Sequence, residues 1–311
     1  MSGCTETGKP LISILMAVYE PRMDWLREQL TSLNDQTYPS LRLYVRDDCS
    51  PTVPYADIER CVAECITRFP YTIVRNEKNL GSNGTFAQLT REAEGQLFAY
   101  CDQDDIWLPE KLTILQEAME RENALLAYSD VSAIDDNGSQ IAQSLCQLRP
   151  RLTYLQGEGL APKLFFRNCI AGCAMLVKAA AARRALPFPQ KTVCDHWIAL
   201  LAAAEGRITL VPGQMVRYRQ HKHNQTGVLA GVTDKESYLR YKVAPLEERL
   251  RCYRQHAEPD QAAVAFAQAR INGTIRDIWK YRAFAPHEAK FEIALHLLPD
   301  FFIRQLLRRL K

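Results

Sequence analysis

Strand-like and helix-like segments alternate through the first hundred residues, and this alternation restricts the fold more than any other feature of the chain. Apolar or alternating runs typical of strands occupy residues 10–19, 41–46, 71–76 and 97–101. Apolar residues at helical spacing lie between them, over 24–33, 58–69 and from about 85. Strands separated by helices of about ten residues predict a parallel sheet with right-handed crossovers.

The later part of the chain changes character. Strand-like runs cover 124–131 and 171–177, and two short ones cover 207–213 and 215–221. Helical patterns cover 179–186 and 194–206, and 144–159 is predicted to be a surface loop. Beyond about residue 234 only charged helical patterns remain. We therefore predict an α/β domain over residues 1–231 and a helical extension over 232–311.

Composition restricts the class of protein. The chain has 311 residues, of which 47% are hydrophobic and 24% charged, as in ordinary globular proteins. A net charge of +3 is too small to indicate a nucleic-acid partner. Apolar runs are shorter than the roughly 20 residues that a membrane span needs, and the N-terminus does not resemble a secretory signal. Ten scattered cysteines then indicate reduced thiols in a cytoplasmic protein, without a zinc site.

The C-terminal segment, residues 293–311, reads I-A-L-H-L-L-P-D-F-F-I-R-Q-L-L-R-R-L-K and combines an apolar face with basic residues. This pattern is typical of a helix at a membrane surface, here the inner face of the cytoplasmic membrane. A helix packed on the α/β domain or on the partner in a homodimer would show the same pattern. Vesicle co-sedimentation of the full chain against a chain truncated after Ala285 would separate these alternatives.

Acidic residues follow the predicted strands, at the sheet edge where such folds bind ligands. Asp102, Asp104 and Asp105 follow the fourth strand, and carboxylates of this kind can hold Mg²⁺ or Mn²⁺ on a diphosphate. A solvated acidic turn is the alternative. At the second strand, Asp48 either accepts hydrogen bonds from a nucleoside or caps a helix. Arg75, after the third, either binds a phosphate or base or is an ordinary exposed arginine.

Two downstream features complete the pattern. Asp195 lies at a predicted helix start beside His196 and Trp197, and is either a general base or a residue that stabilises the helix N-terminus. The indole of Trp197 could form a wall for a sugar ring. The stretch from Arg217 to His223 is rich in basic and imidazole side chains, which would suit a diphosphate or a solvated loop.

Seven segments in this order resemble family 2 glycosyltransferases with the GT-A fold, and among them the rhamnosyltransferase-like bacterial members. The segments are I-S-I-L-M-A-V-Y-E (12–20), V-R-D-D-C-S (45–50), R-N-E-K-N-L-G-S-N-G-T-F (75–86), A-Y-C-D-Q-D-D-I-W-L-P-E-K-L (99–112), N-C-I-A-G-C-A-M-L-V (168–177), C-D-H-W-I-A-L-L-A-A-A-E-G (194–206) and V-R-Y-R-Q-H-K-H-N-Q-T-G (216–227). The resemblance covers residues 10–228 and implies a Rossmann-like, mostly parallel sheet between helices. It does not cover the C-terminal extension.

The resemblance also implies roles for individual residues. Asp104, with His221, would hold the Mg²⁺ or Mn²⁺ that bridges the donor diphosphate, and Asp195 would be the catalytic base. The expected donor-binding residues are Ala17, Tyr19, Glu20, Asp47, Asp48, Arg75, Asn79, Gly81, Asp102 and Gln103. The residues expected at the acceptor or the diphosphate are His196, Trp197, Arg219 and Asn224.

The expected activity is an inverting transfer of a sugar, rhamnose or another hexose, from a nucleotide sugar. UDP- and dTDP-linked donors are favoured, and the acceptor would be a hydroxyl of a saccharide or lipid-linked molecule in bacterial surface polysaccharide synthesis. A sugar nucleotidyltransferase is a weaker alternative, because A-V-Y-E-P-R-M-D (17–24) lacks a glycine-rich, basic phosphate loop after the first strand. A non-catalytic nucleotide- or carbohydrate-binding module would need neither a base nor a metal.

Overall fold

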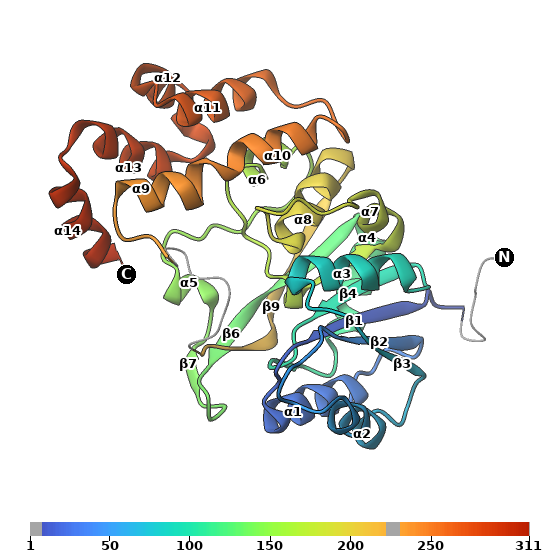
Figure 1. Cartoon of the computed structure of the whole chain (residues 1–311). Coiled ribbons are helices and arrows are strands. Elements are labelled where there is room, and N and C mark those ends of the chain that lie inside the picture. The colour runs from blue at the N-terminus through green and yellow to red at the C-terminus, as the bar shows by residue number, and fades with distance from the viewer. Residues whose placement is uncertain (1–7, 222–230, 311) are drawn as a thin grey trace. The chain divides into compact units, whose positions relative to one another are not determined.

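The computed structural model describes residues 8–221 and 231–310, which form two compact units (Figure 1). The first unit contains 8–159, Cys169–Phe188 and Val193–His221. The second contains Leu160–Asn168, Pro189–Thr192 and 231–310. Every residue that the sequence places at the candidate site belongs to the first unit, except Asn224, which lies outside the described residues.

A nine-stranded mixed sheet forms the centre of the first unit. Its strands are β1 Ile12–Val18, β2 Leu41–Asp47, β3 Tyr71–Arg75, β4 Leu97–Cys101, β5 Ile106–Trp107, β6 Leu126–Ile134, β7 Gln140–Ala142, β8 Met175–Lys178 and β9 Ile208–Arg219. The order is β3-β2-β1-β4-β8-β6-β9-β5, and β7 pairs with β6. The first four strands are mutually parallel, as the alternating pattern predicts. In contrast, β8 runs antiparallel to both β4 and β6.

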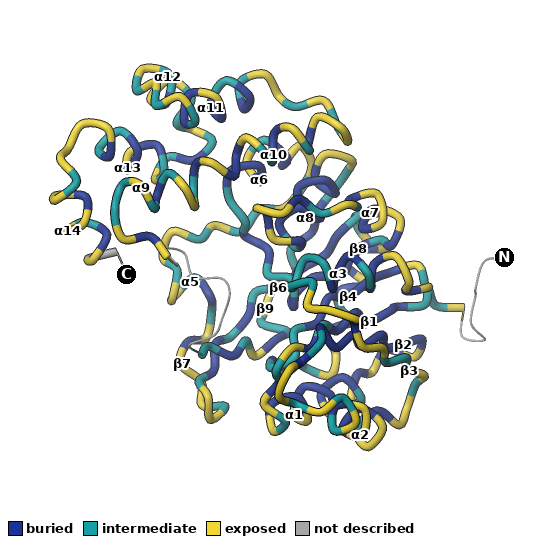
Figure 2. Tube along the Cα trace, in the orientation of Figure 1, coloured by how far each residue is buried: buried dark blue, intermediate teal, exposed yellow. Residues whose placement is uncertain are grey.

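Helices cover both faces of this sheet. They are α1 Met23–Asn34, α2 Tyr55–Cys65, α3 Gly81–Glu92, α4 Lys111–Arg121, α5 Leu145–Leu148, α7 Ala179–Arg184 and α8 Cys194–Glu205. In Figure 1, α1 and α2 lie on one side of the sheet, and α3 and α7 on the other. Strands β1 and β4 are almost entirely buried (Figure 2), which explains why their sequences are apolar runs and not alternating ones.

Two local predictions were wrong. The two short strands expected over 207–213 and 215–221 are one strand, β9. Pro212 and Gly213 interrupt the strand-like pattern in the sequence, but in the structure they only bulge out of the pairing of β9 with β6. Val211 pairs with Ser129 and Gln214 with Asp130, so these two residues have no counterpart on β6. The strand expected from residue 171 begins only at Met175, after a 3₁₀ turn, η1, over Gly172–Ala174.

The second unit is helical. It contains α6 Ala161–Leu164, α9 Lys235–Tyr238, the π-helix η2 Leu239–Val243, α10 Pro245–Tyr253, α11 Gln261–Asn272, α12 Ile275–Lys280, the 3₁₀ turn η3 Arg282–Phe284, α13 Pro286–Leu297 and α14 Asp300–Leu310. A buried ion pair joins two helices, with Arg270 Nη2 2.6 Å from Glu292 Oε1. Within the described chain, no helix is both long and apolar enough to span a membrane.

The exposed side of α14 combines aromatic and basic residues, since Arg304 and Arg308 are exposed as well as Phe301 and Phe302. Phe301 and Phe302 are 64% and 53% exposed, whereas Ile303 and Leu307 are buried in the core of the second unit. The membrane or dimer contact expected for this segment stays a prediction.

Candidate active site

The carboxylates at the end of β2 are buried and bonded within the protein. Asp47 is fully buried and accepts hydrogen bonds from the backbone and hydroxyl of Ser50. Asp48 accepts from the backbone N–H groups of Leu80 and Gly81, at 2.7 and 2.8 Å, and from the Asn76 amide at 2.7 Å. Asp48 therefore stabilises the start of α3 from a distant part of the chain. It does not cap the helix that follows it, α2, whose N-cap is Pro54.

The remaining residues expected near the nucleotide base surround this edge. Arg75 Nε lies 3.3 Å from Asp47 Oδ2, and the Arg75 guanidinium donates to Ser50 O. The Glu20 carboxylate accepts hydrogen bonds from Thr52, and these bonds lower its pKa. The Gln103 amide exchanges two hydrogen bonds with the backbone of Tyr19, whose side chain is 45% exposed. This pair links the end of β1 to the loop after β4.

Three further residues were expected to bind the donor, and the backbone determines where each of them lies. Ala17 lies near the end of β1 and pairs with Arg46 on β2. Asn79 Oδ1 accepts a hydrogen bond from Gly81 N at 3.0 Å. Gly81 has a φ of +70°, a conformation that favours glycine, so the chain can turn sharply into α3. Asn79 and Gly81 thus shape the turn between β3 and α3.

The acids after β4 are in a different environment. We call Asp102, Asp104 and Asp105 the acid cluster. Burial, together with the charges of Asp104 and Asp195, raises the pKa of Asp102 to about 7. Asp195 arrives from α8, some ninety residues later, so the fold brings together the two acid sites that the sequence singled out. Such mutual repulsion among carboxylates favours a cation between them.

Asp104 forms a pair with His221, as expected for a joint role. Asp104 Oδ2 lies 2.6 Å from His221 Nε2, and both side chains are largely buried. The imidazole also contacts the indole of Trp25 on α1, with ring centroids 5.1 Å apart. A carboxylate and an imidazole in this arrangement are suitable ligands for a divalent metal.

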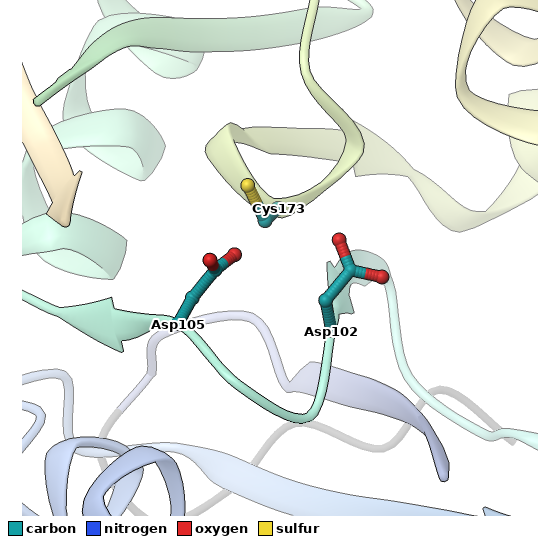
Figure 3. Close-up of side chains that lie close together, drawn as sticks. All are labelled: Asp102, Asp105 and Cys173. Carbon is teal, nitrogen blue, oxygen red and sulfur yellow. The ribbon is translucent and has the colours of Figure 1, made fainter. Parts of the chain in front are cut away.

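Asp105, in contrast, supports the loop from inside. It is fully buried and accepts a hydrogen bond from the backbone of Arg219 at 3.0 Å. Figure 3 shows its side chain beside those of Asp102 and Cys173, whose ligand atoms lie within 4.8 Å of one another. Burial raises the pKa of the Cys173 thiol well above its usual range.

Arg219 is buried beneath the acid cluster, not exposed to a diphosphate. Its Nε donates to Asp104 O at 2.8 Å and its Nη2 to Glu28 Oε2 at 2.5 Å, and its side chain is 1% exposed. The guanidinium also lies over the Trp25 ring. Arg219 thus fixes the backbone of the Asp104 loop, and its buried guanidinium is not placed to contact a diphosphate.

Asp195 is the second residue of α8, whose N-cap is Val193, so its carboxylate does not cap the helix. Its Oδ2 accepts a hydrogen bond from Gly172 N at 3.0 Å, and its Oδ1 from His196 N at 2.5 Å. The position at the N-terminus also favours the ionised form through the helix dipole.

The neighbours of Asp195 face inward. Trp197 is fully buried and its indole N–H donates to Ala185 O at 2.9 Å, so the indole is part of the core and not a wall for a sugar. His196 is also buried, at 6% exposure. Consecutive residues of a helix point to different faces, and here Asp195 is the one that faces the site.

Two residues of the site were not singled out from the sequence. Gly172 contacts Asp195, and Lys111 is fully buried at the start of α4, where its Nζ donates to Cys173 O at 2.5 Å. Burial lowers the pKa of Lys111 to about 7. Both lie within segments quoted for the family resemblance, and that is the only signal in the sequence that marks them.

The sequence of the chain is similar to those of known glycosyltransferases. The sequence profile described as glycosyl transferase family 2 matches residues 13–183, more than half of the chain. A glycosyltransferase of Methanocaldococcus jannaschii without a characterised activity is 26% identical over 69% of this chain and 72% of its own length. The Escherichia coli protein WfgD, named as a UDP-Glc:α-D-GlcNAc-diphosphoundecaprenol β-1,3-glucosyltransferase, is 24% identical over 65% of this chain and 73% of its own.

Solved structures share the fold. TarS of Staphylococcus aureus (residues 1–349) aligns with a TM-score of 0.58 at 14% identity, over 92% of this chain and 86% of TarS. The mannosyltransferase PcManGT of Pyrobaculum calidifontis, in complex with GDP-Man and Mn²⁺, aligns with a TM-score of 0.58 at 15% identity, over 97% of this chain and 79% of its own. The sheet with its flanking helices and the profile match together show that the chain is a family 2 glycosyltransferase with the GT-A fold.

Proposed function

We propose that this glycosyltransferase is metal-dependent and inverting, and moves a hexose from a UDP- or dTDP-linked donor to a hydroxyl group of a saccharide or lipid-linked acceptor. The observation that carries the proposal is the proximity of Asp195 to Asp102 at the carboxyl end of β4, two residues before Asp104: the charges of both Asp104 and Asp195 act on Asp102. One carboxylate can then accept a proton while the others hold the donor's charged end through a cation.

The residues present fit a hard divalent cation. Asp104 and His221 would hold Mg²⁺ or Mn²⁺, and Asp102 would face the donor ribose or sugar. The raised pKa of Asp102 supports this, because a nearby cation would relieve the repulsion that raises it. A bound cation supplies positive charge that stabilises the departing nucleoside diphosphate.

Relatives support the substrate class. WfgD is named for a UDP-Glc donor and a diphosphoundecaprenol-linked acceptor, and TarS has been solved with UDP-GlcNAc. PcManGT has been solved with GDP-Man and Mn²⁺, which supports the divalent metal. Its donor carries guanine, not uracil, so the nucleotide base differs between proteins of this fold. We propose surface polysaccharide synthesis as the process, on the inner face of the cytoplasmic membrane where lipid-linked acceptors are glycosylated.

In the proposed reaction, the acceptor hydroxyl attacks the anomeric carbon as the bond to the diphosphate breaks. Asp195 removes the hydroxyl proton, and the backbone bonds from Gly172 and His196 hold its carboxylate in place. A single displacement of this kind inverts the anomeric configuration.

Asp195→Asn tests the base. It keeps the side-chain size but cannot take a proton, and its amide nitrogen cannot accept one of the two backbone N–H bonds. We expect turnover to fall by about 10²- to 10⁴-fold while UDP binding with Mn²⁺ stays unchanged. Turnover is measured as nucleoside diphosphate released in the presence of a glycolipid extract, with the donor chosen from UDP-, dTDP- and GDP-sugars by thermal shift.

The matched control is Asp260→Asn, the same substitution at the start of α11, where Asp260 caps the helix by accepting from Ala263 N. Turnover near that of the wild type in Asp195→Asn would refute the assignment.

A further inference from the structure

We propose that the turn η1 sets the position of the catalytic carboxylate, with Gly172 as its positioning residue. This inference rests on the proposed role of Asp195 as the base. The turn comes from the segment N-C-I-A-G-C-A (168–174) and contacts both Asp195 and the acid cluster.

The first contact is a hydrogen bond from backbone to carboxylate. Gly172 N–H donates to Asp195 Oδ2 at 3.0 Å, while His196 N–H donates to Oδ1. Both donors are backbone groups, so the plane of the carboxylate is fixed without the freedom of a donor side chain. Such preorganisation is what a general base requires, because proton transfer depends on distance and direction.

The second contact is one of close packing. A Cβ atom at residue 172 would lie 3.2 Å from Asp195 Cβ and 3.4 Å from its Oδ2. Gly172 is not among the residues with positive φ, so glycine is needed here for space and not for backbone conformation. Any side chain at this position would push Asp195 by a few tenths of an ångström.

The same turn is anchored on its other side. Cys173 Sγ lies beside the carboxylates of Asp102 and Asp105, as Figure 3 shows, and Lys111 Nζ donates to Cys173 O at 2.5 Å. Lys111 is fully buried, with its ammonium over the Trp107 ring. The turn therefore connects the base to the acid cluster, and its position determines the spacing between acceptor and donor chemistry.

Gly172→Ala tests this role, with Gly206→Ala as the matched control. Gly206 lies at the other end of α8 and is equally crowded, because a Cβ there would lie 3.1 Å from Leu125 Cδ1. We expect kcat of Gly172→Ala to fall by about 10- to 100-fold relative to the control, since small misplacements of a reacting group have effects of this size. Melting temperature and UDP affinity with Mn²⁺ should match those of the control.

A double variant adds a readout that a merely structural role would not give. If Gly172 acts through Asp195, Gly172→Ala should have no further effect on the residual turnover of Asp195→Asn. A kcat within about twofold of the control, a loss of UDP affinity at unchanged kcat, or additive losses in the double variant would each overturn the inference. High activity in Asp195→Asn itself would instead overturn the proposed base, so the two failures are distinguishable.

Discussion

The carboxylates after β2 and those after β4 occupy equivalent places in the fold but different environments. Asp47 and Asp48 are surrounded by donors, which include Ser50, Asn76 and two backbone N–H groups at the start of α3. Asp102 lies among other carboxylates, and burial together with their charges raises its pKa to about 7. Hydrogen-bond donors compensate the carboxylates at the β2 end, whereas Asp102 at the β4 end lies beside like charges.

This difference separates two uses of the same residue type. Acids that are fully hydrogen-bonded in the folded protein stabilise it, here by fixing the loops that lead into α3. Acids that repel one another cost stability and are expected where a cation or a reaction compensates for them. Position at the carboxyl end of a strand is therefore not sufficient to identify the reactive acid.

The largest effect on stability is expected at the β2 end. Asp48→Asn replaces acceptors with an amide that cannot satisfy the N–H groups of both Leu80 and Gly81, and should lower the free energy of unfolding by about 3 kcal/mol. Asp104→Asn serves as the contrast and should change it by less than about 1 kcal/mol, because it also removes a repulsive charge. Urea unfolding without metal measures both, and equal losses would remove the distinction.

A smaller effect concerns pH. The folded-state pKa of Asp102 is raised, so the folded protein binds a proton more tightly than the unfolded chain between about pH 4 and 7. Stability from this group is present at low pH and is lost as pH rises through 7. Asp102→Asn lacks this loss, so its stability relative to the wild type should rise by about 2–3 kcal/mol between pH 5 and pH 8. Thermal unfolding without metal at the two pH values measures this, and a constant difference would contradict it.

Much of the fold follows from the sequence. The runs that became β1 and β4 are apolar because these central parallel strands are covered on both faces, and periodicity detects this directly. The acids at their ends were recognisable because parallel strands place their carboxyl ends at one edge. The antiparallel β8 was not predictable, since strand direction depends on partners far away in the chain.

The sequence does not reveal in which direction a side chain points, and this limited how much of the site could be predicted. Arg219 and Trp197 are of types that suit a diphosphate and a sugar, yet both are buried, and no local pattern distinguishes a buried arginine from an exposed one. Gly172 acts through its backbone N–H, which all residues except proline possess, and the Lys111 side chain donates to the backbone carbonyl of Cys173. Their roles become visible only when residues distant in sequence are brought together.

The central claim is that the β4 end, not the β2 end, holds the cation and the donor's charged groups. Crystals grown with Mn²⁺ and UDP, examined by anomalous diffraction at the manganese edge, test it directly. We expect a manganese peak at Asp104, within coordination distance of its carboxylate and of His221. A peak at Asp47 or Asp48, or UDP bound with no metal at Asp104, would contradict it.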